Sequence, residues 1–171
     1  MLCYVAFNHY DKERVTKIGP DAAAAEWLLK NEGSIRGRGF SAWVEDYGGV
    51  SVCYTPSFKI AEIKAVDADI TSGGCEHFKG LDHLKSVTLT GCVNIGDHGL
   101  QLICRHCHKT VETIDITGTG ISTSGLKHLF ACSNLKSLTH DQRLCYSNGQ
   151  LYSETLEKLR ELNKELKVVV L

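Results

Sequence analysis

The chain has 171 residues, of which 43 % are hydrophobic and 23 % are charged, and its formal net charge is −1. This composition is typical of a globular chain with one domain, or one small domain with an appendage, and gives no electrostatic reason to bind nucleic acid. No apolar run reaches the ~18 residues that span a bilayer. Residues 1–15 lack the layout of a secretory signal or an organellar presequence, so we expect such a leader to be absent here or removed.

The first third of the chain predicts one well-defined helix. In "GPDAAAAEWLLKNEG", Pro20 suits the first helical position, the alanines have high helix propensity, and Gly33 suits the C-terminal stop. Trp27 shares a helix face with Ala24 and Leu28, so we expect its side chain to lie in the core rather than to bind a ligand.

The next segment, "SIRGRGFSAWVEDY" at residues 34–47, predicts one or two short strands with Trp43 between them. Arg36 and Arg38 are then either a pair that recognises a partner or charges on a solvated edge strand. The following "GGVSVCYTPS", at residues 48–57, predicts a loop that leads into the rest of the chain.

Two later segments repeat one pattern. They are "LKSVTLTGCVNIGDHGLQLI" from Leu84 and "VETIDITGTGISTSGLKHL" from Val111, whose starts are 27 residues apart. In each, three apolar strand positions precede a turn, an isoleucine and a Gly-Leu pair that opens a helix. The strand positions are Leu84, Val87 and Leu89, then Val111, Ile114 and Ile116. A period of ~20–29 residues with one strand and one helix per unit is typical of leucine-rich repeats.

Weaker copies of the pattern flank these two segments. Upstream, the expected strand positions are Ile63, Val66 and Ala68. Downstream, they are Leu135, Leu138 and His140. A helix from Ser153 to about Asn163 should present three leucines on one side, and "LKVVVL" should form a last strand. Those leucines are Leu156, Leu159 and Leu162.

The sequence therefore predicts an α/β fold in two parts. A short helical and irregular N-terminal domain (residues 1–59) precedes a leucine-rich-repeat-like solenoid of about four strand–helix units with a parallel sheet (residues 60–171). One unit cannot bury its own apolar face, so the units must stack, with strands on one side and helices on the other. Such surfaces serve binding more often than catalysis.

The run "CRHCH" is the strongest candidate for a metal or haem site. C-x-x-C-H is the pattern of a c-type haem, and C-x-x-C is half of many zinc sites. Cys132 or His128 could complete a zinc site with Cys104, Cys107 and His108, but no second C-x-x-C or H-x₃-H follows. We therefore expect neither zinc nor haem, and interpret the eight scattered cysteines as mostly buried free thiols of a reducing compartment.

Residues 11–47, "DKERVTKIGPDAAAAEWLLKNEGSIRGRGFSAWVEDY", resemble the N-terminal segment of the mitochondrial ATP synthase coupling factor B (subunit s) family. The matching features are D-x-x-R-[VI], G-P-D-x-A-A-x-E-W-L-L-[KR], a Gly–x–x–Arg step and W-x-x-D-Y. The similarity continues through "IKAVDA", "GLDHLKSVTLTGC", I-x-D-x-G-L and the closing strand, and so covers nearly the whole chain. A related family is distal membrane-arm assembly component 2, which assists the assembly of respiratory complex I.

The resemblance implies a non-catalytic coupling factor. Its family is peripheral on the matrix side of the mitochondrial inner membrane, where it supports proton conduction by ATP synthase through protein contacts. The implied partners are subunits of the membrane sector or stalk. The sequence itself contains no Gly-rich phosphate loop, G-x-S-x-G or H-E-x-x-H, so an enzyme is not expected.

The resemblance also implies two candidate sites. Family members carry a thiol associated with activity in "L-x-C-x-C"; its second cysteine corresponds to Cys92 and its first to Thr90. A vicinal dithiol is therefore absent, which leaves a single active thiol or a buried turn cysteine. The family also holds magnesium on main-chain carbonyls, which correspond to those of Ile60 and Gly91. No other cofactor is expected.

Three functions remain open at this point. The first is the coupling factor, the second is an assembly factor for complex I, and the third is a cysteine-containing leucine-rich-repeat adaptor, although the expected F-box is not seen. In each case we expect the uncovered sheet side and the segment with Arg36, Arg38 and Trp43 to dock onto a partner.

Overall fold

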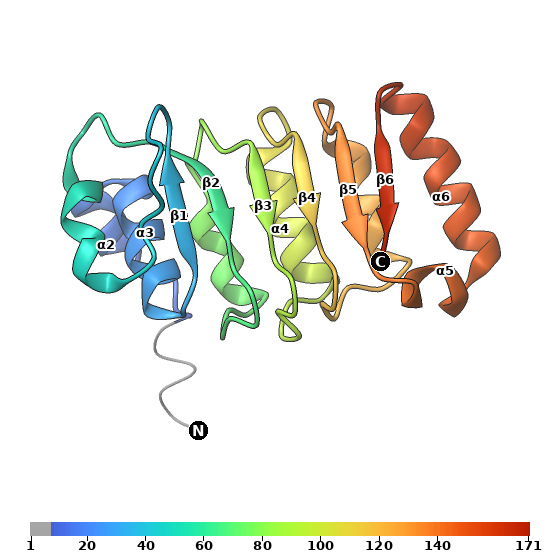
Figure 1. Cartoon of the computed structure of the whole chain (residues 1–171), viewed down its shortest axis with the longest axis horizontal. Helices are drawn as coiled ribbons and strands as arrows, with labels where there is room; N and C mark the ends of the chain where they lie inside the picture. The colour runs from blue at the N-terminus through green and yellow to red at the C-terminus, as the bar shows by residue number, and fades with distance from the viewer. Residues whose placement is uncertain (1–7) are drawn as a thin grey trace.

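A computed structural model describes residues 8–171, and its strands form one six-stranded sheet in the order β1-β2-β3-β4-β5-β6 (Figure 1). β1 pairs antiparallel with β2, and all later neighbours are parallel. The strands are Ser34–Gly37 (β1), Ile60–Lys64 (β2), Ser86–Thr88 (β3), Thr113–Asp115 (β4), Ser137–His140 (β5) and Lys167–Val170 (β6).

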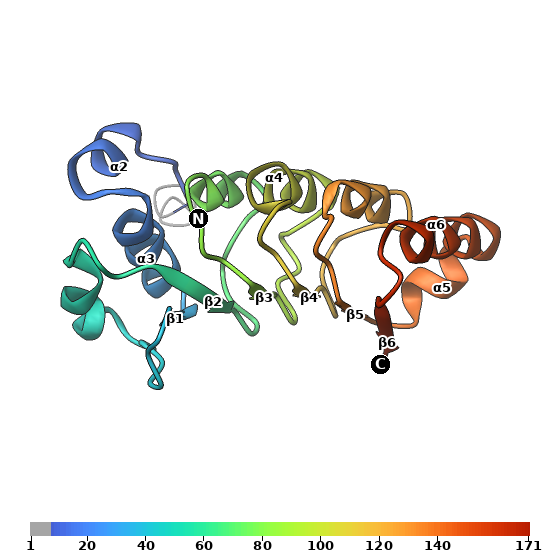
Figure 2. The same cartoon turned by 90° about the horizontal axis from the view of Figure 1, so that it is seen from above.

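Helical segments alternate with these strands and cover only one face of the sheet (Figure 2). The α-helices are Lys12–Ile18 (α2), Pro20–Lys30 (α3), Asp97–Cys107 (α4), Arg143–Ser147 (α5) and Gly149–Leu162 (α6). The 3₁₀ helices are Tyr47–Tyr54 (η1), Gly73–Phe78 (η2) and Gly125–Ala131 (η3). This alternation confirms the predicted α/β, solenoid-like architecture.

Equivalent positions of successive units form rows through the core. Because Ile63, Val87, Ile114 and Leu138 pair in register, each stacks on the same position of the next strand. All four side chains are fully buried. Burying one such side chain contributes roughly 1.5–3 kcal/mol, so stacking supplies what a single unit lacks.

The predicted register of the first unit is wrong by three residues. The sheet places Ile63 beside Val87, so the first unit uses Ile60, Ile63 and Ala65 rather than Ile63, Val66 and Ala68. Val66 is 46 % exposed, and Ala68 is buried in the turn that follows. Val66 is apolar as well, so both registers are compatible with the sequence alone.

The N-terminal helix is confirmed as α3, and its first turn is tied to the sheet. The Asp21 carboxylate accepts hydrogen bonds from the Ile60 amide and the Lys59 ammonium, both at 2.9 Å. Trp27 is buried, as expected, and stacks on His77 with ring centroids 5.1 Å apart. One hydrophobic cluster runs from α3 to the last unit. The division between residues 59 and 60 stays a prediction.

The segment after α3 forms β1 and an isolated antiparallel bridge between Ile35 and Val44, in agreement with the predicted short strands. The predicted loop at residues 48–57 is instead mostly a 3₁₀ helix, η1. Asp46 caps it by accepting a hydrogen bond from the Gly49 amide at 3.1 Å. That capping residue precedes the Gly-Gly pair that led to the loop prediction.

The last helix differs from its prediction in extent and in the face it buries. α6 begins at Gly149 rather than at Ser153, and Asn148 caps it by accepting from the Leu151 amide. Leu156 and Leu159 are buried, but Leu162 is 47 % exposed because the helix ends there. The predicted common face of three leucines is therefore wrong for the third.

Candidate interaction surface

The uncovered face of the sheet is polar. On the three central strands β3, β4 and β5, the outward positions are Ser86, Thr88, Thr113, Asp115, Ser137 and Thr139. All are half-buried, and no helix crosses this face in the view from above (Figure 2). Hydroxyl groups on a shallow sheet can contact another protein, but they do not form an enclosed site for a reaction.

Arg36, Glu62 and Trp43 form a compact cluster at one end of this face. The Arg36 guanidinium donates to Glu62 Oε1 from Nε at 3.0 Å and from Nη2 at 2.6 Å. It also lies over the Trp43 ring, 4.9 Å from the centroid. The structure thus brings two of the predicted partner-binding residues together, and shows that Arg36 already has an internal partner.

Arg38 points elsewhere. Its side chain is exposed and makes no ion pair with a residue in the range 8–171, while its backbone amide donates to Lys59 O at 2.7 Å. It lines a hollow of about 430 Å³ at the edge where strands β2 to β5 begin. The hollow is lined by Arg38, Ala61, Asp82, His83, Lys85, Lys109, Thr110, Glu112 and Asn134.

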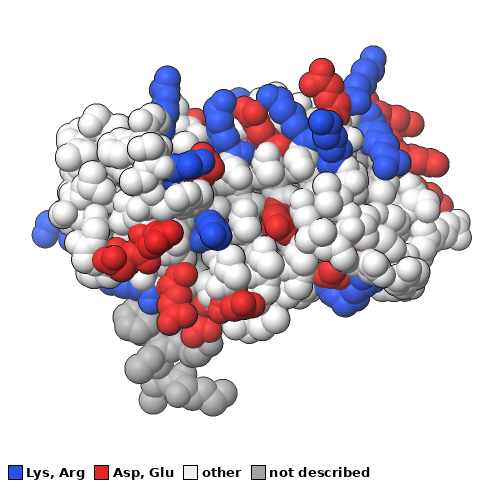
Figure 3. All heavy atoms as spheres, in the orientation of Figure 1, with Lys and Arg blue, Asp and Glu red and all other residues white. Residues whose placement is uncertain are grey.

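Basic side chains gather along this edge, at the top of the space-filling view (Figure 3). Glu112 lies among them and pairs with Lys136 at 2.7 Å and with Lys85 at 2.9 Å. The hydrogen bonds from these two ammonium groups lower the pKa of the Glu112 carboxyl, and the bond from Lys136 has the larger effect. At the opposite edge, Asp115 ends β4, and Asp141 follows β5 and pairs with Arg143 at 3.6 Å.

Cys92 lies where the thiol site was expected, in the turn after β3, and is fully buried. Its thiol donates to Ala65 O of the preceding unit at 3.6 Å. Burial raises the pKa of this thiol, which disfavours the reactive thiolate. The side chain thus joins two units of the solenoid.

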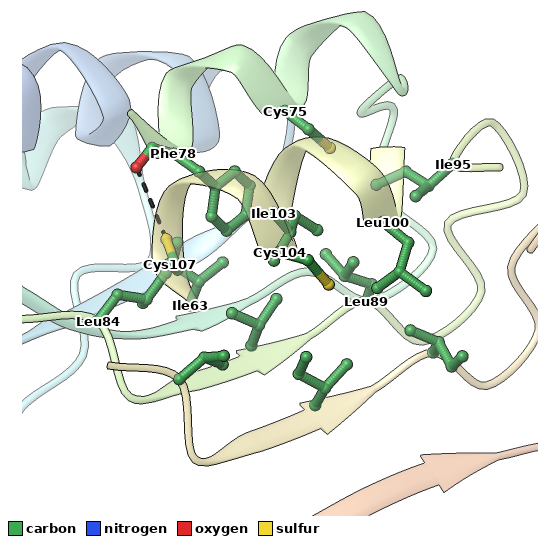
Figure 4. Packing of buried hydrophobic residues seen from close by; sticks show 14 of the residues in the cluster. Ile63, Cys75, Phe78, Leu84, Leu89, Ile95, Leu100, Ile103, Cys104 and Cys107 are labelled. Carbon is green, nitrogen blue, oxygen red and sulfur yellow. Dashed lines mark hydrogen bonds between the residues drawn. The ribbon is translucent and has the colours of Figure 1, made fainter. Parts of the chain in front are cut away.

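The "CRHCH" cysteines lie on the core side of α4 (Figure 4). Cys107 donates to Phe78 O at 3.7 Å, and burial raises its pKa to about 12. The neighbouring Cys132 and burial together raise the pKa of Cys104. Within residues 8–171, no three His, Cys, Asp or Glu side chains are placed to hold one metal ion. Cys3 lies outside the described residues.

The carbonyls assigned to magnesium do not meet. Ile60 opens β2, whereas Gly91 follows the end of β3 with a φ of +72° and lies beside Asp67. The intervening strand alone separates them by roughly 13 Å, but two oxygens on one magnesium ion lie at most about 4 Å apart. The structure therefore does not support a site shared by these two carbonyls.

A polar cluster around Trp27 was not found from the sequence. The Trp27 indole and the Thr71 amide both donate to Asn8 Oδ1, at 3.3 and 2.9 Å. His77 stacks on Trp27 and its Nε2 lies 3.2 Å from His9 O. Gly74 permits this packing, since a Cβ there would lie 2.8 Å from the Trp27 ring. No local pattern links these residues, because they come from three separate segments.

No helix within residues 8–171 combines the length and the apolar character that crossing a bilayer requires.

No family model matches the chain. The mitochondrial ATP synthase subunit s of Rattus norvegicus is 34 % identical over 135 residues, which cover 77 % of this chain and 68 % of the relative. The subunit s of Homo sapiens is 34 % identical over the same shares, and that of Bos taurus 32 %. The chain therefore belongs to the family of mitochondrial ATP synthase subunit s, or coupling factor B.

Proposed function

We propose that this protein is a non-catalytic accessory subunit of the mitochondrial ATP synthase that supports proton conduction and energy coupling through protein–protein contact. The observation that carries the proposal is the 34 % identity to ATP synthase subunit s over most of the chain. The shallow polar face of the sheet is a further support, because it suits contact with a protein better than turnover of a substrate.

The proposal includes a place in the cell and a docking face. The protein acts at the matrix side of the inner membrane as a peripheral component, held by subunits of the membrane sector or stalk, and it needs no cofactor. Its docking face contains the Arg36–Trp43 cluster at the end of the uncovered sheet and Arg38 at the edge where the strands begin. Arg and Trp side chains are the usual anchors of such contacts.

Reconstitution tests the function. Inner-membrane particles stripped of their endogenous factor would receive the purified protein, and ATP-driven proton uptake would be recorded. We expect the proton gradient to recover. If particles that respond to an authentic subunit s do not respond to this protein, the coupling role is wrong, and complex I assembly intermediates become the place to look for a partner.

The docking face needs variants that separate binding from folding. Arg36→Ala would leave Glu62 without its partner and Trp43 without its cation, so the change affects the local fold as well as the surface. The double substitution Arg36→Gln with Glu62→Gln removes one charge of each sign, so it keeps the net charge and leaves neither member of the pair as an unpaired ion. Lys158→Gln with Glu161→Gln is the matched control, because this pair lies exposed on α6.

We expect the Arg36/Glu62 double variant to restore proton uptake only at a protein concentration roughly tenfold higher than the wild type needs. The Lys158/Glu161 double variant should behave as the wild type, since exposed ion pairs contribute little. Equal titration curves for both double variants would exclude the Arg36–Trp43 cluster from the docking face. They would leave the coupling role itself standing.

A further inference from the structure

The strand starts of the solenoid place a row of charged side chains side by side. The Lys85 amide donates to Ala61 O at 2.8 Å, Glu112 to Lys85 O at 2.7 Å, Lys136 to Glu112 O at 2.7 Å and Lys167 to Lys136 O at 2.9 Å. Neighbouring strands lie about 4.8 Å apart, so these side chains form a ladder along the edge. We call this ladder, together with two further cations beside it, the basic edge. Its residues are Arg38, Lys85, Lys109, Glu112, Lys136 and Lys167.

Positive charge on the basic edge exceeds the negative charge available to it. Glu112 is the one carboxylate that both Lys85 and Lys136 share. Arg38, Lys109 and Lys167 make no ion pair with any residue of the described range 8–171. Like charges held this close repel one another, and a bound carboxylate would relieve that repulsion.

Part of this positive charge surrounds the hollow of about 430 Å³. Arg38, Lys85 and Lys109 line it from three different segments of the chain, β1's end and the starts of two units. Thr110 and Asn134 add polar groups that can hydrogen-bond to an oxygen ligand. Asp82 and Glu112 also line it, and Glu112 already pairs with Lys85. The three cations still outnumber the two carboxylates, and this excess suits one further carboxylate group that projects into the recess.

We propose that the basic edge binds an acidic segment of a protein partner, with one carboxylate side chain held in the hollow between Arg38, Lys85 and Lys109. The alternation of signs favours a protein over an anionic membrane. Glu112 stands inside the lysine ladder and Asp82 lines the hollow, so a continuous layer of lipid phosphates would meet both acids. A folded partner can place its charges opposite the cations alone.

This inference rests on the proposed function only for the partner's identity, which is a subunit of ATP synthase. The test compares Lys109→Glu with Lys127→Glu. Both lysines are exposed and make no described ion pair, but Lys127 lies on η3, on the helical side of the sheet. The two variants have the same net charge, so a difference between them reports position.

Binding to stripped inner-membrane particles is measured by titration. We expect Lys109→Glu to bind about tenfold more weakly than the wild type. Adding Arg38→Glu should lower the affinity about tenfold further, and Lys127→Glu should bind as the wild type does. If the wild type binds and Lys109→Glu binds equally well, the hollow is not used, although the proposed function stands.

A second measurement judges the basic edge even if the wild type fails to bind the particles, which would refute the proposed function. A synthetic glutamate-rich peptide is titrated into isotopically labelled protein, and amide shifts are followed by NMR. Shifts around Lys85, Lys109 and Glu112 that disappear in Lys109→Glu support the inference; their absence overturns it. The wild type could instead bind vesicles of equal parts phosphatidylcholine and phosphatidylserine, and not the peptide, while Lys109→Glu fails to bind these vesicles. That result would identify the ligand as membrane and would also overturn the inference.

Discussion

At the scale of single residues, three buried polar side chains in this protein bond to a neighbouring unit rather than to their own. Cys92 donates to Ala65 O, Cys107 to Phe78 O, and the Thr123 hydroxyl to Leu144 O at 3.0 Å. Each bond crosses from one unit to the next, and each satisfies a buried group that would otherwise be costly to leave unpaired. A cysteine that would look reactive in a motif therefore acts as a small hydrophobic residue with a weak donor.

The first prediction concerns thiol reactivity. Of the seven described cysteines, only Cys145 is half-exposed, and the others are buried. Burial raises the pKa of Cys53 to about 11 and also raises that of Cys92. A maleimide added to the native protein at neutral pH should therefore label Cys145 much faster than Cys92. Peptide mapping by mass spectrometry measures this order.

Unfolding provides the control for that experiment. In urea all described cysteines should react at similar rates, because burial no longer protects any of them. If Cys92 reacts as fast as Cys145 in the native state, its turn opens readily. The single-thiol hypothesis for Cys92 would then gain support over its interpretation as a core residue.

The second prediction concerns pH and His77. Burial lowers the pKa of His77 below its ordinary value of 6.5, so the unfolded chain takes up a proton first as the pH falls. The stability from a neutral His77 is complete above pH 6.5 and is lost progressively below it. His77→Phe keeps a ring against Trp27 but cannot be protonated.

Thermal unfolding at about pH 7 and about pH 5 measures this effect. Between these values the melting temperature of the wild type should fall by about 2–4 °C more than that of His77→Phe. The same decrease in both proteins would mean that His77 stays neutral or is protonated without cost. The absolute stability of the variant does not affect the comparison, because each protein serves as its own reference.

At the scale of elements, the ends of the solenoid are closed in different ways. At the N-terminal end, α3 packs Trp27 against η2, and the Arg14–Glu26 ion pair joins α2 to α3. At the other end, His140 takes the place of an apolar strand residue, is fully buried, and has Nε2 3.0 Å from the Tyr152 hydroxyl of α6. In this last strand–helix unit, a polar contact to α6 therefore takes the place of an apolar position of the row.

The third prediction tests how α6 is held. Leu159 is fully buried and Leu162 is 47 % exposed, although both lie on the same helix. Leu159→Ala should lower the free energy of unfolding by about 2–5 kcal/mol, and Leu162→Ala by about 0.5 kcal/mol or less. Urea unfolding followed by circular dichroism provides both values. Equal losses would show that α6 packs on a different face.

At the scale of the whole molecule, the charge distribution matters more than the net charge of −1. The basic edge lies at the starts of the parallel strands, and Asp115 and Asp141 lie at their ends. The basic edge concentrates positive charge at one side of the sheet, and this concentration should orient the molecule in the field of an acidic partner before contact. The composition alone predicted no such effect, because it gives the net charge and not the positions of the charges.

The fourth prediction follows from that polarity. Raising the ionic strength from about 0.01 M to about 0.15 M shortens the Debye length from about 30 Å to about 8 Å. The association rate constant with ATP synthase should then fall about tenfold, while the dissociation rate changes less. Surface plasmon resonance with immobilised enzyme measures both rates. An association rate that does not depend on salt would show that charge does not guide docking.

Much of the fold was predictable because its causes are local. Apolar residues at fixed positions of the repeat predicted the strands, and Pro20 with the alanines predicted α3, as the structure confirms. The errors arose where two local readings were equally good. Ile63, Val66 and Ala68 matched the strand pattern as well as Ile60, Ile63 and Ala65 did. Leu162 matched the helix pattern, but α6 ends at this residue and leaves it exposed.

The candidate site divides in the same way. The repeat, the family resemblance and the types of residue on the exposed strand positions could be derived from the sequence, since these depend on order along the chain. The folded structure was needed to see that Arg36 is already paired with Glu62, that Ile60 and Gly91 lie apart, and that Arg38, Lys85 and Lys109 line one hollow. Those facts depend on the register between strands, which brings together residues that no local pattern connects.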